Sequence, residues 1–305
     1  MSSKRKFRRK VQKIRRYLVY LLTLCFRRIL LLLPFKAAFH LCSFLSLVTY
    51  YILARERRKT LANLRFAWGK EKSEKEIREI ARNVFKNSGR ILAEAVCLPK
   101  LGVPYLESCV TIENPERIIT PYKEGRGVIG LTAHLGNWEY MAAVMANILK
   151  IRFAVIAREY SNPWLNRLLE KNRSSIGVDV IYRGESGLAI LRRLKNKEGL
   201  GILADQNIRG EGIMVDFFGH PAKTLKAVAE LILRTQTPVV PLFIIRNKDL
   251  TKHRLIVENP LIYTVTGNKE IDLKNIAESY TKIIEKYVRR FPDQWMWMHN
   301  RWNLI

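Results

Sequence analysis

A histidine and a glutamate lie five positions apart at the expected junction of a strand and a helix. His134 comes just after the apolar segment 127–132, which is typical of a buried strand, and Glu139 lies in the first turn of the helix that follows. Gly136 and Asn137 between them are a turn and helix-capping signal. The carboxylate can accept a hydrogen bond from one ring nitrogen and leave the other nitrogen to remove a proton from a hydroxyl. The pair therefore predicts activation of an alcohol toward an acyl group, with capping and surface roles as the alternative.

The N-terminal part of the chain combines basic charge with long apolar runs. Residues 1–36 contain no acidic residue, and 37–54 form an uncharged run as long as a membrane-spanning helix. Basic residues flank the apolar zone on both sides, so no clear orientation of a span follows. We expect residues 1–59 to form an interfacial or membrane-embedded anchor, with a buried pair of core helices as the alternative. The apolar zone is too long for a cleaved signal peptide.

The charge of the whole chain selects anionic partners. The 305 residues include 54 Lys and Arg against 27 Asp and Glu, which gives a formal net charge of +27. No nucleic acid is expected, because no zinc-ligand spacing, RNA-binding aromatic motif or helix-turn-helix accompanies the charge. Basic residues beside apolar segments favour anionic lipid instead. The four cysteines show no C-x-x-C spacing, so we expect neither a metal site nor a disulfide framework, and a location that faces the cytosol.

Residues 60–305 are expected to form an α/β domain, of which 60–109 is a helical lead-in. Ser73 and Glu76 form a capping box that opens an amphipathic helix, and Pro99 to Pro104 break it. Expected strands are 110–113, 127–132, 153–157, 178–182, 200–204, 239–245 and 255–257. Expected helices are 55–68, 73–98, 138–149, 162–174, 185–196, 222–235 and 273–291. This alternation predicts a mainly parallel sheet flanked by helices.

Polar residues follow several of the expected strands. His134, Arg158, Arg183 and Asp205 each come just beyond a strand end. Active sites of parallel sheets gather at the carboxyl ends of strands, so these residues are expected to lie at one edge of the sheet.

Four blocks along the chain resemble the late acyltransferases of lipid A biosynthesis, within the wider lysophospholipid and glycerol-phosphate acyltransferase group. The blocks are 134–139, 205–206, 217–224 and 292–302. The resemblance implies a sheet of the glycerol-phosphate acyltransferase type and transfer of a fatty acyl chain to a hydroxyl of an acyl chain on a lipid A precursor. The implied donor is acyl carrier protein, or acyl-CoA, and no cofactor or metal is implied. The implied location is the inner face of the cytoplasmic membrane.

The same resemblance assigns roles to residues around the expected site. His134 is the implied general base, with Glu139 as the residue that orients it; the sequence holds no Gly-x-Ser-x-Gly segment for a covalent nucleophile. Arg158 and Asn162 are implied substrate-binding residues. Arg158, which precedes the Asn162-Pro163 pair, matches a strand-end arginine suited to a phosphate or an oxyanion, although a surface ion pair is an equal alternative. Arg173 corresponds to a helix arginine, with substrate contact or structural pairing as its roles.

Further candidate residues come from the later blocks. Asp205 is expected to position an arginine or the acceptor sugar, or to cap a turn, and Gln206 follows it as a weaker candidate. Lys223 and Thr224 are expected to open the helix 222–235, whose N-terminus would hold a phosphate or the developing oxyanion. A tryptophan cluster is expected to line an acyl groove, to anchor at a membrane interface or to pack in the core: Trp295, Trp297 and Trp302.

Two departures from the family pattern bear on the acceptor. Ser161 replaces the first of two asparagines before the proline, and Asn207 replaces an acidic residue after Asp205-Gln206. One alternative is an acyltransferase for another glycolipid such as a phosphatidylinositol mannoside, whose branch typically has Asp at the place of Glu139. The other alternative is a basic membrane-binding or nucleic-acid-binding protein without catalysis on the same fold.

Overall fold

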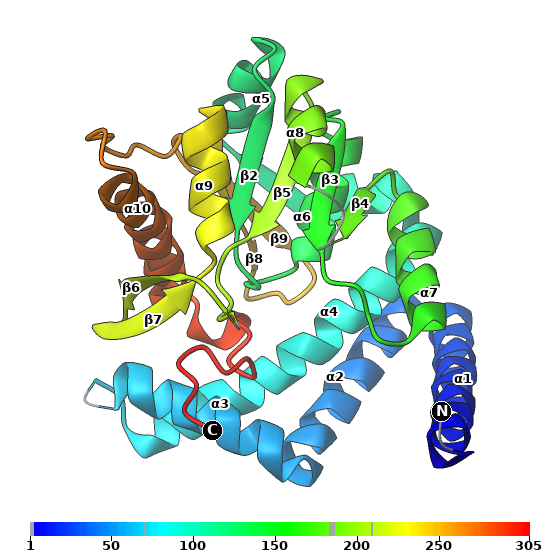
Figure 1. Ribbon diagram of the computed structural model, residues 1–305. Coiled ribbons are helices and arrows are strands. Elements are labelled where there is room, and N and C mark those ends of the chain that lie inside the picture. Colours follow the sequence, from blue (N-terminus) through cyan, green and yellow to red (C-terminus); the bar gives the residue numbers. More distant parts are fainter. Residues whose placement is uncertain (1–2, 70, 183–186, 209) are drawn as a thin grey trace.

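The computed structural model describes residues 3–69, 71–182, 187–208 and 210–305. Its centre is a seven-stranded sheet of order β1-β9-β8-β2-β5-β3-β4. Within this sheet the β8–β9 pair is antiparallel, and the other described pairs are parallel. The strands are β1 (Val110–Glu113), β2 (Val128–Thr132), β3 (Phe153–Ala157), β4 (Asp179–Tyr182), β5 (Gly199–Leu203), β8 (Val239–Arg246) and β9 (His253–Val257). Helices cover both faces of this sheet (Figure 1). The expected mixed α/β class with a mostly parallel, helix-flanked sheet is confirmed.

Most helices of this part of the chain overlap their expected positions: α6 (Trp138–Asn147), α7 (Pro163–Ser174), α8 (Gly187–Lys195), α9 (Lys226–Thr235) and α10 (Lys269–Arg290). Helix α5 (Glu116–Lys123) was not expected, and the short 3-10 turn η1 (Pro292–Gln294) follows α10. Both faces of the central strands are buried: β2 has five consecutive buried residues and β8 has eight. Continuous apolar runs of this kind are typical of parallel strands covered on both sides.

The expected helix 222–235 is wrong at its start. β6 (Ile213–Phe217) and β7 (His220–Thr224) form an antiparallel hairpin, and α9 begins only at Lys226. Phe218 and Gly219 join the two strands, and both have positive φ, of 60° and 73°. Two positive φ values in a two-residue loop are the geometry of a tight hairpin turn. Lys223 and Thr224 therefore end a strand, and no helix N-terminus lies at them.

Four N-terminal helices form a layer beneath the carboxyl ends of the central strands (Figure 1). They are α1 (Ser3–Leu32), α2 (Phe35–Ile52), α3 (Ala54–Trp68) and α4 (Glu74–Cys109). The Ser73–Glu76 capping box of α4 is confirmed, and so is its interruption, at Gly102 with φ 75° and ψ −178°. Gly89 lets α2 approach α4 closely, since a Cβ there would lie 2.1 Å from the Cys42 carbonyl oxygen.

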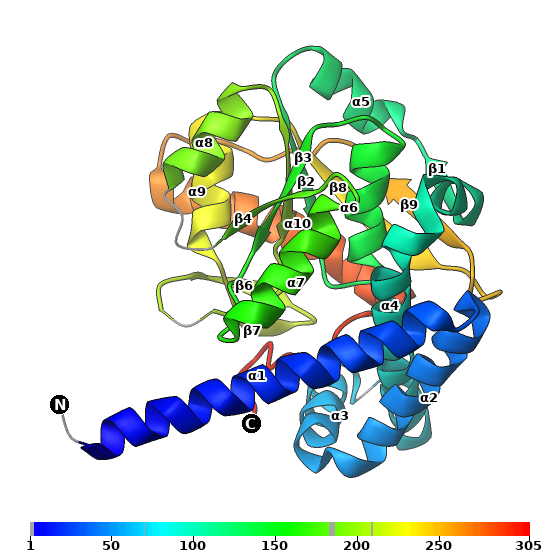
Figure 2. The same cartoon turned by 90° about the vertical axis from the view of Figure 1, so that its right-hand side faces the viewer.

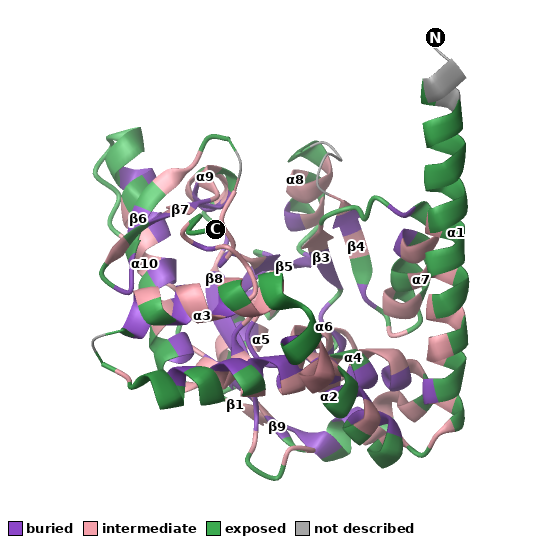
Figure 3. Ribbon diagram, turned by 90° about the horizontal axis from the view of Figure 1, so that it is seen from below, coloured by how far each residue is buried: buried purple, intermediate pink, exposed green. Residues whose placement is uncertain are grey.

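The first two helices expose apolar side chains. Among the described helices, α2 is the one long and apolar enough to cross a membrane by length and composition. It packs one face on α4, while Phe44 and Ile52 are 62% and 69% exposed. Helix α1 extends past the rest of the molecule and is exposed along most of its length (Figures 2 and 3).

Candidate functional site

His134 and Asp205 face each other at the carboxyl ends of neighbouring strands. Thr132 at the end of β2 pairs with Leu203 at the end of β5, so the residues just beyond them meet. His134 Nδ1 lies 2.9 Å from Asp205 Oδ1, and the His134 backbone N–H donates to Asp205 Oδ2 at 2.9 Å. The aspartate side chain is 1% exposed and the histidine side chain 21%. One ring nitrogen is therefore held from inside the protein, and the residue is open on its other side.

The Asp205 carboxylate is buried but kept ionised. Burial alone would raise the pKa of this carboxyl, but the charge of His134 and the hydrogen bonds from His134 and Trp295 outweigh it and bring the pKa to about 2. The Trp295 indole Nε1 donates to Oδ2 at 2.7 Å. A carboxylate that accepts from Nδ1–H fixes the tautomer whose free lone pair is on Nε2, and it stabilises the imidazolium when Nε2 takes a proton.

In contrast to the expected geometry, Asp205 and not Glu139 contacts the His134 ring nitrogen among the described residues. The Glu139 carboxylate forms a two-bond pair with Arg173 of α7: Arg173 Nε donates to Oε2 at 3.0 Å and Nη2 donates to Oε1 at 2.6 Å. Both side chains are 19% exposed. Burial would lower the pKa of Arg173, but the hydrogen bonds and charge of Glu139 raise it above its ordinary value. Asp205 reaches the ring because β5 lies beside β2, whereas the planar fork of Arg173 matches the Glu139 carboxylate.

The loop that carries His134 is fixed by its backbone. The Gly136 N–H donates to the Gln294 carbonyl at 3.0 Å, and the Met296 N–H donates to the His134 carbonyl at 3.1 Å. Gly136 has a φ of 61°, and a Cβ there would lie 1.6 Å from the Ile244 carbonyl oxygen. Glycine is therefore required at this position for both its conformation and the close approach of β8.

A buried ion pair supports the same loop from below. Glu94 of α4 and Arg246 at the end of β8 have side chains 1% and 4% exposed, and Arg246 Nη2 donates to Glu94 Oε2 at 2.6 Å. Asn137 Nδ2 donates to the same Glu94 oxygen at 2.7 Å, while Asn137 Oδ1 caps α6 by accepting from the Tyr140 N–H. Glu94 and Arg246 were not expected at the site; the available signal was a charge inside the apolar segment 91–98 and another at the end of the apolar strand 239–245.

The remaining candidates occupy different surroundings. Gln206 Nε2 lies 3.4 Å from His134 Nε2, so the side-chain amide is beside the free ring nitrogen. Arg158 is exposed beyond β3, and no ion pair of its side chain is seen among the described residues. Asn162 is 7% exposed and caps α7 by accepting from the Trp164 N–H at 3.2 Å. Arg183 lies outside the described residues.

Lys223 and Thr224 lie at the end of β7, and the helix whose N-terminus was expected there begins instead at Lys226. The Lys223 carbonyl accepts a hydrogen bond from Arg301 Nη1, and Thr224 is fully buried with its Oγ1 3.4 Å from the Ala204 carbonyl oxygen. Burial lowers the pKa of Arg301 to about 10. These residues connect the hairpin and the C-terminal segment to the strand end that carries Asp205.

The tryptophan cluster packs in the core. Trp295 and Trp297 are 1% and 0% exposed, and their rings meet at 4.6 Å between centroids. Trp295 also contacts Phe217 of β6, which seats the C-terminal segment on the hairpin. Of the three roles expected for this cluster, core packing is the one seen for these two residues.

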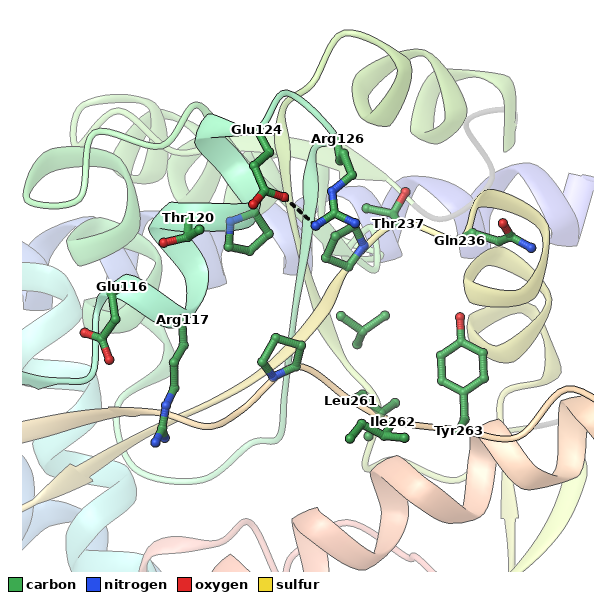
Figure 4. A pocket seen from close by; sticks show the side chains of 14 residues that line it. Glu116, Arg117, Thr120, Glu124, Arg126, Gln236, Thr237, Leu261, Ile262 and Tyr263 are labelled. Carbon is green, nitrogen blue, oxygen red and sulfur yellow. Dashed lines mark hydrogen bonds and ion pairs between the residues drawn. The ribbon is translucent and has the colours of Figure 1, made fainter.

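A cavity of about 700 Å³ lies at the opposite end of the sheet (Figure 4). It is lined by Arg126, which precedes β2, and by Val239, which begins β8, together with residues of the loop after β9. Arg126 is paired with Glu124 at 2.5 Å. The cavity is therefore at the amino ends of the strands, away from His134.

The geometry around His134 supports proton transfer from a hydroxyl to His134 Nε2.

The chain is similar to known acyltransferases. The family model described as "Bacterial lipid A biosynthesis acyltransferase" matches residues 4–303. A phosphatidylinositol mannoside acyltransferase of Mycolicibacterium smegmatis is 22% identical over 228 residues, which are 73% of this chain and 72% of that protein. Another, of Mycobacterium tuberculosis, is 26% identical over 121 residues, 38% of each chain.

Proposed function

The chain belongs to the bacterial lipid A biosynthesis acyltransferase family, and we propose that it transfers a fatty acyl chain from acyl carrier protein to a hydroxyl of an acyl chain on a lipid A precursor. The observation that carries this proposal is the pairing of His134 Nδ1 with the buried Asp205, which leaves Nε2 to act as a general base. The family membership supplies the acyl-transfer chemistry that such a base serves.

In the proposed reaction the acceptor oxygen attacks the donor thioester directly. His134 Nε2 takes the hydroxyl proton as the new C–O bond forms, and the carbonyl oxygen becomes an oxyanion. The C–S bond then breaks, and the departing thiolate takes the proton back from the imidazolium. Asp205 holds the ring and balances its charge throughout. The chemistry needs no cofactor, because the acyl group is already activated as a thioester.

We assign the other polar groups of the site to binding and positioning. Gln206 beside Nε2 is placed to hydrogen-bond the attacking or carbonyl oxygen. The exposed Arg158 offers a guanidinium fork to a phosphate of the acceptor. Glu139 and Arg173 act as a pair that fixes α6 against α7 beside the base.

A second acceptor is favoured by one specific observation. The two relatives described above are both phosphatidylinositol mannoside acyltransferases. A glycolipid of that class would use the same base and the same thioester, since its sugar hydroxyl is deprotonated in the same way. The acceptor, and not the chemistry, distinguishes the two candidates.

The test is transfer of a radiolabelled acyl chain by the full-length protein in detergent or vesicles. Acyl carrier protein and CoA thioesters serve as donors, and a Kdo-modified tetra-acylated lipid A precursor and phosphatidylinositol mannoside serve as acceptors. We expect labelled lipid A product with the carrier-protein donor and much less product with the mannoside. Product on the mannoside alone would assign the second acceptor, and binding of anionic lipid with no product from any pair would support the non-catalytic alternative.

We also propose that residues 1–59 hold the protein on the inner face of the cytoplasmic membrane, with 60–305 as the transferase domain. In α1, Phe7, Leu22 and Leu32 are 69%, 70% and 84% exposed, interspersed with Lys and Arg. Apolar side chains flanked by basic groups are suited to the interface of an anionic bilayer. Figure 1 shows α1, α2 and α3 at the bottom of the molecule, and Figure 3, seen from below, shows exposed residues along α1 and on α2 that can meet lipid.

The net charge of +27 predicts that donor binding is sensitive to salt. Acyl carrier protein is acidic, so attraction over the Debye length should aid its encounter with this chain. We expect the KM for the acyl carrier protein donor to rise as ionic strength rises, with a smaller change in kcat. Steady-state kinetics over a series of salt concentrations measures this, and a constant KM across the series would contradict electrostatic recognition of the carrier.

A further inference from the structure

Helix α7 contacts α1 at one end and the candidate site at the other. We infer that Asn162 is a positioning residue that fastens α7 to α1 and thereby holds Arg173 against Glu139. The inference rests on the proposed function for its kinetic consequence, but the contact itself has a readout of its own.

The contact between the two helices involves one amide with two partners. Asn162 Oδ1 accepts from the Trp164 N–H at 3.2 Å and caps α7, while Asn162 Nδ2 donates to the Arg16 carbonyl of α1 at 2.8 Å. A helical carbonyl has a second lone pair, so it accepts this bond without any break in α1. The rings of Tyr17 and Trp164 meet edge to face at 5.4 Å beside it. Figure 2 shows this end of α7 resting on the middle of α1.

The far end of α7 reaches the site. Arg173 makes the two-bond pair with Glu139. Glu139 lies in the first turn of α6, and the loop just before this helix carries His134. Asn172 Nδ2 donates to the Ala95 carbonyl of α4 at 2.8 Å, so this end is tied to two helices. A hydrogen-bonded helix is stiff along its axis, so a shift at Asn162 is carried to Arg173.

The consequence is that α1 has two roles. It presents apolar and basic side chains outward, and the Arg16 carbonyl in its middle accepts the hydrogen bond from Asn162 at the start of α7. The geometry of Arg173 and Glu139 therefore depends on α1 remaining beside α7. A misplacement of about 1 Å at a positioning residue can lower a rate by as much as about 10²-fold.

The substitution Asn162→Asp separates the two functions of the amide. Aspartate keeps an oxygen for the Trp164 N–H and is as good an N-cap as asparagine. It removes the donor to Arg16 and places an oxygen against that carbonyl. We expect kcat to fall by about tenfold or more, with KM for both substrates changed less than about twofold. The matched control is Asn268→Asp, since Asn268 is an exposed N-cap of α10 whose amide oxygen accepts from the Glu270 and Ile271 N–H groups; its kcat should not change.

A second variant approaches the contact from α1. Tyr17→Ala removes the ring that packs on Trp164. Because both substitutions release the same contact, the double variant should lose little more activity than the stronger single variant. Additive losses would overturn the shared origin, and a rise in KM alone for Asn162→Asp would overturn positioning in favour of a substrate contact.

Hydrogen exchange reports on the contact without activity. Full-length protein on vesicles of phosphatidylcholine and phosphatidylglycerol is compared with its variants, and exchange of the backbone amides of residues 163–174 is measured. We expect faster exchange in Asn162→Asp and Tyr17→Ala than in wild type and Asn268→Asp. If wild type transfers no acyl chain, the proposed function fails, but the exchange measurement still tests the contact between α1 and α7. Unchanged exchange in both Asn162→Asp and Tyr17→Ala would overturn the inference.

Discussion

Asp205→Asn is expected to lower kcat by about 10²- to 10⁴-fold with little change in KM. The amide has the shape of the carboxylate but lacks its charge, so it cannot stabilise the imidazolium that forms when Nε2 takes the acceptor proton. Its NH₂ group can also donate to Nδ1, which would favour the tautomer with the proton on Nε2, where the base must be free. Since Asp205 is nearly fully buried, water cannot replace the lost interaction.

Steady-state acyl transfer with the purified variants measures this loss. His134→Ala should show a loss of similar size, and the double variant should be no slower than His134→Ala, because the two residues act as a unit. Asp216→Asn is the matched control, since Asp216 is exposed and accepts only the Gly219 N–H among its described contacts. A full-rate Asp205→Asn beside an inactive Glu139→Gln would return the orienting role to Glu139.

Arg246→Met is expected to lower the free energy of unfolding by about 3–5 kcal/mol. The substitution leaves the Glu94 carboxylate buried without its paired guanidinium, since the side chains of this pair are 1% and 4% exposed. Asn137 alone still donates to Glu94, and one neutral donor does not offset the loss of solvation. The loop that carries His134 rests on this network, so activity should fall with stability.

Denaturant unfolding in a fixed detergent measures this prediction, with midpoints compared at constant slope. Glu94→Leu combined with Arg246→Met should recover much of the loss, because two apolar side chains leave no unpaired charge. Arg65→Met is the control: Arg65 is paired with Glu74, but its side chain is 47% exposed, so its loss should cost about 1 kcal/mol or less. Equal shifts in Arg246→Met and Arg65→Met would show that the buried pair contributes no more than a surface pair.

Local patterns predicted most of the fold. The ends of β1 and β3 agree with the expected 110–113 and 153–157, and the capping box starts α4 where Ser73 and Glu76 place it. Local patterns gave the wrong element type at the hairpin β6–β7 and missed helix α5. The hairpin β6–β7 was read partly as a helix because its strands are short, and α5 was missed because it contains Pro121.

The site was predicted in part. The place of His134 beyond β2 follows from an apolar strand and a turn, both of which are local signals. Its partnership with Asp205 depends on β5 lying next to β2, although β3 and β4 come between them in the chain. Hydrophobic patterning does not determine strand order. The sequence therefore favoured Glu139, which is close to His134 along the chain, over Asp205, which is close to it in space.

The contact between Trp295 and Asp205 sets an order of events during synthesis. The indole that holds the aspartate lies more than 240 residues after α2 in the chain, so α1 and α2 leave the ribosome well before it. Proteins fold largely from the N-terminus as they are made. The growing chain can therefore reach a lipid surface before its base has been assembled, and a product that stops short of Trp295 would arrive at the membrane without a finished catalytic centre.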